Sequence, residues 1–135
     1  MIFAAPRAIL SIGFADANNL LAGVMSLKGF KVFKSNSTND CLSTLQNSEK
    51  VDAVLIDKES AVENNFFLVN QIKRMAPDVM IVIIADCIDR SQELLRNNID
   101  EIVLMPTSPE NLTDKVLNML AKRELKRLKE AAYYP

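Results

Sequence analysis

Residues 79–84 read Val-Met-Ile-Val-Ile-Ile, and this run decides the fold class. Six consecutive apolar residues leave no polar face for water, so a strand made of them must be buried on both faces. Strands of this kind occur in parallel sheets that carry helices on each side. We therefore expect residues 79–84 to form a central or nearly central strand of an α/β protein.

Shorter apolar runs alternate with segments of helical period along the rest of the chain. The predicted strands are residues 8–12, 30–33, 53–56, 79–84 and 102–104. A helix is predicted after each strand, which gives a (βα)₅ order. This order favours an open, doubly wound, five-stranded parallel sheet with right-handed crossovers.

Capping residues predict where the helices begin and end. In chain order these are Asp16 or Asn18, Gly29, Ser37 with Asp40 as a capping box, Pro77, Asp89 with Gln92, and Ser108-Pro109-Glu110. The fourth helix carries Leu94 and Leu95. The third helix is expected to start at Phe66 or Phe67, so that residues 60–65 form a turn.

The last helix is predicted to extend beyond the sheet domain. Its apolar residues keep a 4, 4, 3, 4 spacing at Leu117, Ala121, Leu125, Leu128 and Ala132. We assign residues 1–120 to the domain and residues 121–135 to the extension and tail. The extension carries five basic and two acidic side chains, a charge of +3 against −4 for the first 120 residues. Such a segment is either a solvated basic face or a coiled-coil or docking surface.

Composition excludes several classes of function. The chain has 135 residues, 49% of them hydrophobic and 24% charged, as in a single soluble globular domain. A net charge of −1 gives no general attraction to nucleic acid or to an anionic membrane. The absence of histidine excludes histidine bases, histidine metal ligands and Ser-His-Asp triads. Cys41 and Cys87 are expected to be free thiols of a cytoplasmic protein.

Ligands of open parallel sheets bind beyond the carboxyl ends of the strands. The residues that follow the predicted strands include Gly13 and Phe14, Asp57 to Glu59, Ala85 to Cys87, and Met105 to Thr107. They contain neither a GxGxxG nor a GxxxxGK[ST] loop, and the chain has only three glycines. We therefore expect no nucleotide cofactor.

An aspartate closes the third predicted strand in Ala53-Val54-Leu55-Ile56-Asp57. With the (βα)₅ order, this resembles the receiver domain of two-component response regulators, the CheY-like family, over residues 7–122. Leu68, Ile72 and Lys73 match family positions of the third helix, and Pro106 matches the proline of its Lys-Pro pair. The resemblance implies that Asp57 is the phosphoacceptor candidate and that partners include a histidine kinase or an output domain.

The rest of the family's active site is missing. Gly13 and Phe14 stand where the resemblance implies the acidic pair that holds Mg²⁺. Ala85 replaces the Ser or Thr, Met105 the lysine and Ile102 the aromatic switch residue. Because phosphoryl transfer depends on neutralising charge, these changes indicate a degenerate site, or pseudo-receiver, and we expect it to hold no metal ion.

The expected function is therefore a non-enzymatic signalling module that acts through protein–protein interaction, without normal aspartate phosphorylation. The resemblance places its partner surface on the fourth helix, the fifth strand and the last helix, and this surface could also form a homodimer. The candidate residues are Ile102, Leu117, Ala121, Leu125 and Leu128. Two alternatives stay open. One is an atypical receiver that accepts a phosphoryl group on Asp57 from a histidine kinase with weak help from Mg²⁺, and the other is a small enzyme or ligand-binding domain of flavodoxin-like fold.

Overall fold

The computed structural model describes residues 5–11, 15–48, 50–85, 99–105 and 107–132. They form one sheet of five parallel strands in the order β2-β1-β3-β4-β5. The strands are β1 (Arg7–Ser11), β2 (Lys31–Lys34), β3 (Ala53–Asp57), β4 (Met80–Ala85) and β5 (Glu101–Leu104). The apolar run that decided the fold class lies in β4, between β3 and β5, and the prediction of an interior parallel strand is confirmed.

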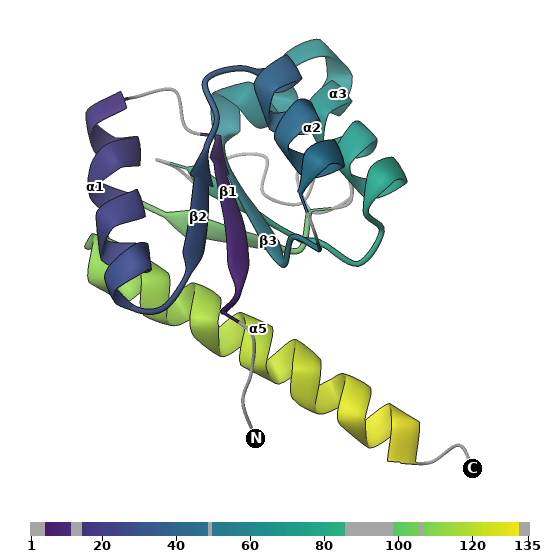
Figure 1. The fold of residues 1–135 in the computed structure, drawn as a ribbon. Helices are drawn as coiled ribbons and strands as arrows, with labels where there is room; N and C mark the ends of the chain where they lie inside the picture. Colours follow the sequence, from purple (N-terminus) through teal and green to yellow (C-terminus); the bar gives the residue numbers. More distant parts are fainter. Residues whose placement is uncertain (1–4, 12–14, 49, 86–98, 106, 133–135) are drawn as a thin grey trace.

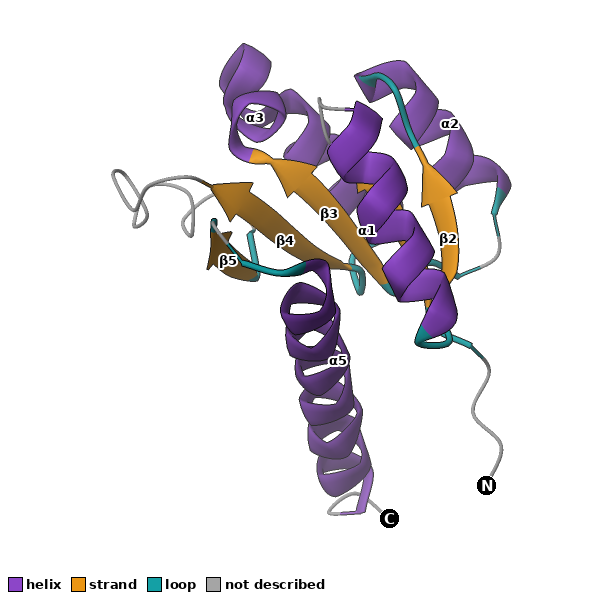
Figure 2. Ribbon diagram, turned by 90° about the vertical axis from the view of Figure 1, so that its left-hand side faces the viewer, coloured by secondary structure: helices purple, strands orange, loops and turns teal. Residues whose placement is uncertain are grey.

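Helices cover both faces of the sheet (Figures 1 and 2). The described helices are α1 (Ala15–Leu27), α2 (Thr38–Asn47), α3 (Lys58–Met75) and α5 (Pro109–Ala132). The predicted fourth helix, with Asp89, Gln92, Leu94 and Leu95, lies outside the described residues. None of the helices that the structure describes is both long enough and apolar enough to cross a membrane.

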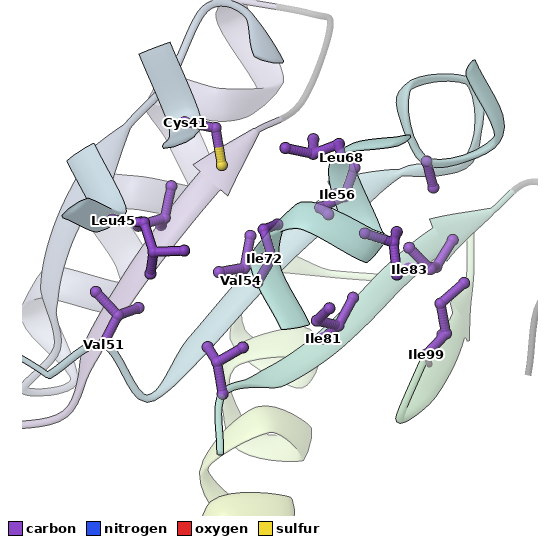
Figure 3. Packing of buried hydrophobic residues seen from close by; sticks show 14 residues of the cluster. Cys41, Leu45, Val51, Val54, Ile56, Leu68, Ile72, Ile81, Ile83 and Ile99 are labelled. Carbon is purple, nitrogen blue, oxygen red and sulfur yellow. The ribbon is translucent and has the colours of Figure 1, made fainter. Parts of the chain in front are cut away.

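Alternating side chains of the strands divide the core into two clusters. Ile9, Val54 and Ile81 point to the side of α2 and α3, where they meet Leu45 and Ile72 (Figure 3). Their neighbours Leu10, Leu55 and Val82 point to the opposite side, where α1 and α5 supply Met25 and Val116. This alternation follows from the period of two residues in a strand, and it explains why β4 and residues 53–56 of β3 are apolar on both faces.

The predicted start of the first helix is wrong. Because α1 already begins at Ala15, Asp16 and Asn18 lie inside the helix and neither can be its cap. Asn18 is instead buried, with 4% of its surface exposed. The predicted end is confirmed, since Gly29 follows the helix with a φ of 100°, a conformation that favours glycine.

The capping prediction for α2 is confirmed at Ser37, whose side chain accepts a hydrogen bond from the backbone N–H of Asp40. The return bond differs from a capping box. The Asp40 carboxylate accepts from the N–H of Asn36, at 3.0 Å, one residue before the cap. The sequence pattern therefore predicted the cap residue and the acidic residue correctly, but not the N–H group that the acid accepts from.

The predicted turn at residues 60–65 is wrong for its first half. The first turn of α3 starts at Lys58, directly after β3, and the helix is interrupted only at Glu63–Phe66. Asn64, Asn65 and Phe66 adopt left-handed backbone angles there, with φ between 51° and 62°. Ala61 is the only fully buried residue between Lys58 and Asn65. A helical turn that buries one alanine leaves no apolar period in the sequence.

The last helix begins as predicted. Pro109 is its first residue, and the Ser108 hydroxyl accepts a hydrogen bond from the N–H of Asn111 at 3.1 Å. A salt bridge of 2.6 Å between Lys28 and Asp114 joins it to the end of α1. The extension is also confirmed as helical, since α5 runs to Ala132 and projects well beyond the sheet (Figure 1).

Candidate functional site

Asp57 is the last residue of β3 and directly precedes α3. It stands in register with Ile84 of β4, at the carboxyl edge of the sheet. Only 9% of its surface is exposed, and its side chain does not cap the helix that follows. Within the described residues no donor reaches its Oδ1 atom. The sheet therefore presents a nearly buried carboxylate with one oxygen that accepts no hydrogen bond.

Two further predicted site residues lie at the same edge. Ala85 ends β4, and Met105 follows β5 directly (Figure 2 shows the strand ends). The backbone N–H of Met105 donates to the carbonyl of Ala85 at 2.7 Å, so the two positions are adjacent. A methyl group and a thioether supply neither a hydroxyl donor nor a cation. The structure thus brings together the positions expected to lack a donor and a cation.

The remaining predicted site residues Gly13, Phe14 and Pro106 lie outside the described residues, as do Asp86 and Cys87. The side-chain chemistry of Gly13 and Phe14 nevertheless shows whether these two residues could be ligands of Mg²⁺. Mg²⁺ requires oxygen ligands, and neither glycine nor phenylalanine has a side-chain oxygen. In the described part of the chain no three acidic or cysteine side chains are grouped so that they could hold a metal ion. The acidic pair that the resemblance implies is therefore absent at these two positions, and the described residues supply no other group of ligands for Mg²⁺.

Sequence reasoning missed Asn18, which it assigned to a helix cap. Asn18 and Asp57 each have a buried side-chain oxygen that accepts no hydrogen bond from the described residues. Buried polar atoms are usually paired, so such atoms mark places of strain or function. Asn18 belongs to α1, which follows β1, the neighbour of β3 in the sheet. No sequence signal separates a buried asparagine of this kind from a cap.

The third-helix residues that carried the resemblance have structural roles. Leu68 and Ile72 are buried in the core on the α3 side of the sheet. The Lys73 ammonium donates to the carbonyl of Val79 at 2.7 Å and to the carboxylate of Asp100 at 3.0 Å. These contacts tie α3 to the start of β4, far from Asp57 along the strand.

Cys41 is a core residue of α2, fully buried in the first cluster. Burial, and to a smaller extent the charge of Asp40, raise the pKa of its thiol to about 12, although a hydrogen bond with Ser35 acts in the opposite direction. Because the thiolate is the reactive form, this cysteine is inert in the folded protein.

The predicted partner residues divide into two groups. Ile102 packs against the cluster beneath α2 and α3, and Leu117 packs against the cluster beneath α1 and α5. Ala121, Leu125 and Leu128 are exposed, with exposed fractions of 53% for Leu125 and 52% for Leu128. The exposed group lies entirely on the projecting part of α5.

No protein-family model matches the sequence, and no curated protein matches it. Solved structures do resemble the fold. A CheY-like response regulator receiver domain protein from Methanospirillum hungatei gives a TM-score of 0.78 at 15% identity, over 90% of this chain and 98% of that one. The signal receiver domain of a putative Luxo repressor protein from Vibrio parahaemolyticus gives 0.77 at 16% identity, over 93% and 97%.

NtrX from Brucella abortus gives a TM-score of 0.80 at 20% identity. The match covers 96% of this chain and 29% of NtrX, so the chain corresponds in length to one part of that larger protein. At these identities the likeness concerns the fold. The doubly wound five-stranded sheet predicted from the sequence is therefore confirmed as the fold of CheY-like receiver domains.

Proposed function

We propose that this protein is a receiver-like signal transduction module that acts by binding another protein, without normal phosphorylation of an aspartate. One observation carries the proposal: the Asp57 carboxylate is nearly buried at the strand edge where Ala85 and Met105 replace the expected hydroxyl and cation. The likeness to receiver domains supports a signalling role.

The chemistry of phosphorylation argues against a normal acceptor. A phosphoryl group adds a charge of about −1.5 to −2 and three acceptor oxygens that need donors or cations. Receiver chemistry supplies little covalent help, so the rate depends on neutralising this charge. At this edge of the sheet the adjacent strand β4 ends in a buried alanine, and the residue that follows β5, the next strand along, is a methionine. A phosphoryl group there would be formed slowly and held poorly.

Under this proposal the protein transmits a signal by binding another protein and not by a chemical reaction. The proposed partner is a protein, either a histidine kinase, an output domain or a second copy of this chain. The exposed residues Ala121, Leu125 and Leu128 of α5 support this part of the proposal, since they provide apolar surface that the domain's own core does not use.

Titration with Mg²⁺ and beryllofluoride, followed by amide chemical shifts, tests the proposal. Beryllofluoride mimics a phosphoryl group on a carboxylate. We expect no shifts near Asp57 at Mg²⁺ concentrations up to about 10 mM, because the donors that Mg²⁺ needs are missing. The Asp57→Asn variant is the matched control, since it removes the carboxylate charge and keeps the shape of the side chain.

Shifts that cluster around Asp57 and vanish in Asp57→Asn would contradict the proposal. They would favour the alternative of an atypical receiver that accepts a phosphoryl group from a histidine kinase. The double variant Phe14→Asp with Met105→Lys restores one acid and the cation, and it should gain a response to Mg²⁺ and beryllofluoride. If the double variant responds and the unmodified protein does not, residues 14 and 105 account for the inactivity of the site.

A further inference from the structure

The face of α5 that lies toward the domain is apolar in the first half of the helix and polar in the extension. In the first half, Leu112 and Val116 are buried against the sheet, with 4% and 0% of their surfaces exposed. Seven residues after Val116, on the same face of the helix, lies Arg123. Its guanidinium donates to the carbonyl of Asp78 at 2.9 Å, which holds the start of the extension against the domain. In the extension, the face toward the domain is therefore polar.

The apolar residues of the extension lie on the opposite face. Ala121, Leu125 and Leu128 follow one another at spacings of four and three residues, which places them in one stripe along the helix. All three are exposed, and α5 stands clear of the sheet and of the other helices there (Figure 2). This stripe makes no contribution to the domain's own core.

We propose that this stripe binds a second copy of itself, as a parallel, in-register, two-stranded coiled coil over residues 118–132. The inference rests on the proposed function, a protein-binding module, and names the partner of its α5 surface. In heptad terms Asn118 and Leu125 occupy a positions, and Ala121 and Leu128 occupy d positions. A single asparagine at an a position favours a parallel pair in one register.

The charges beside the stripe select the same arrangement. Glu124 takes the g position and Lys129 the e position of the next heptad, so each Glu124 meets Lys129 of the second copy when the helices run parallel. In an antiparallel pair e positions face each other, and Lys122 and Lys129 would be brought together. Within the described part of α5, Glu124 has a weak competing contact of 4.0 Å with Arg127 at the surface.

The domains do not obstruct the pair. Each sheet domain packs against the face of α5 that carries Val116 and Arg123, and the stripe lies on the other side of the helix. Two copies can therefore meet along the extensions with their domains turned outward.

The paired segment spans about 22 Å, which is two heptads. Because the contact between the two helices is so short, we expect the two chains to associate weakly, with a dissociation constant of about 0.1–1 mM.

Sedimentation equilibrium of the full chain between 10 µM and about 2 mM tests the pairing. We expect a monomer–dimer equilibrium that Glu124→Lys and Lys129→Glu each weaken about tenfold, because each creates two like-charged pairs. An equimolar mixture of the two variants should dimerise again, since both interhelical pairs become complementary. Glu130→Lys makes the same charge change on the outer face and should leave the equilibrium unchanged.

Disulfide formation tests the register. In a Cys87→Ser background, Leu128→Cys should form an interchain disulfide on oxidation, whereas Lys126→Cys, which points away from the seam, should not. A monomer at all concentrations, no recovery in the mixture, or equal cross-linking at both positions would overturn the inference. Binding of the monomer to anionic phospholipid vesicles through Leu125 would also overturn it. The proposed function would still stand or fall separately, on the Mg²⁺ and beryllofluoride titration.

Discussion

The variants Leu112→Ala and Leu128→Ala compare the two faces of α5. We expect the first to lower the free energy of unfolding much more than the second. The same atoms are removed from the same helix in both variants. Leu112 is 96% buried and packs against the sheet, whereas Leu128 has 52% of its surface exposed and touches no core cluster of the described residues. Any difference in the free energy of unfolding therefore reports packing and not helix propensity.

The magnitudes follow from burial. Leu→Ala changes at well-packed positions cost about 2–5 kcal/mol, so Leu112→Ala is expected to lower the free energy of unfolding by about 3 kcal/mol. Leu128→Ala is expected to change it by less than about 0.5 kcal/mol, since the remaining burial comes from the helix's own turns and alanine is a good helix former.

Urea denaturation at about 5 µM protein, where the proposed dimer is dissociated, measures both variants. Equal slopes of the unfolding transitions would show that the midpoints can be compared as stabilities. A loss of about 2 kcal/mol or more in Leu128→Ala would refute the reasoning, because the stripe would then belong to the monomer's core.

Four further variants test single polar or ionisable side chains. Asp57→Asn is expected to raise the free energy of unfolding by about 1 kcal/mol, because burying a neutral amide costs less than burying a carboxylate whose Oδ1 has no donor among the described residues; a loss of stability in chemical denaturation would contradict this. Asp100→Ala is expected to lower it by about 1 kcal/mol, since the Asp100 carboxylate accepts from the N–H of Ile81 at 2.8 Å. Asp114→Ala, at an exposed salt bridge, is the control and should be nearly neutral in the same assay. For Cys41 the folded pKa of about 12 lies above the ordinary value of 9.0, so the unfolded chain loses its proton first. Stability should therefore fall as pH rises from about 9 to 12, by about 1 kcal/mol per pH unit, and Cys41→Ala should remove this part of the pH dependence.

The sequence predicted the elements that bury a continuous face. The run at residues 79–84 and the alternation around it were sufficient for the parallel sheet, because a strand buried on both faces has few other arrangements. The cap at Ser37 and the start at Pro109 were predictable because a short side chain makes a local hydrogen bond there. Interactions within a few residues of one another leave a pattern in the sequence.

The predictions that were wrong concern residues whose environment is set by distant parts of the chain. Asn18 looked like a cap because asparagine favours caps, and only the packing of α1 on the sheet buries it. The first turn of α3 shows no helical spacing of apolar residues in the sequence, because Ala61 is the only residue that this turn buries. The environment of Asp57 was also beyond the sequence, since its burial and its Oδ1 without a donor depend on how three strand ends meet.

An unphosphorylated Asp57 and a pairing α5 extension, taken together, change the kind of signal to which such a module would respond. In a phosphorylated receiver, a charge added at the carboxyl edge of the sheet alters the affinity of a distant surface. Without that charge, binding by the Leu125–Leu128 stripe must respond to something else. Two heptads give a dissociation constant of about 0.1–1 mM, so the paired fraction follows the local concentration of the chain steeply in that range. Attachment to a larger assembly would raise the effective concentration of the stripe to millimolar values and complete the pairing with no chemical step at Asp57. The input of such a module would then be colocalisation of two copies.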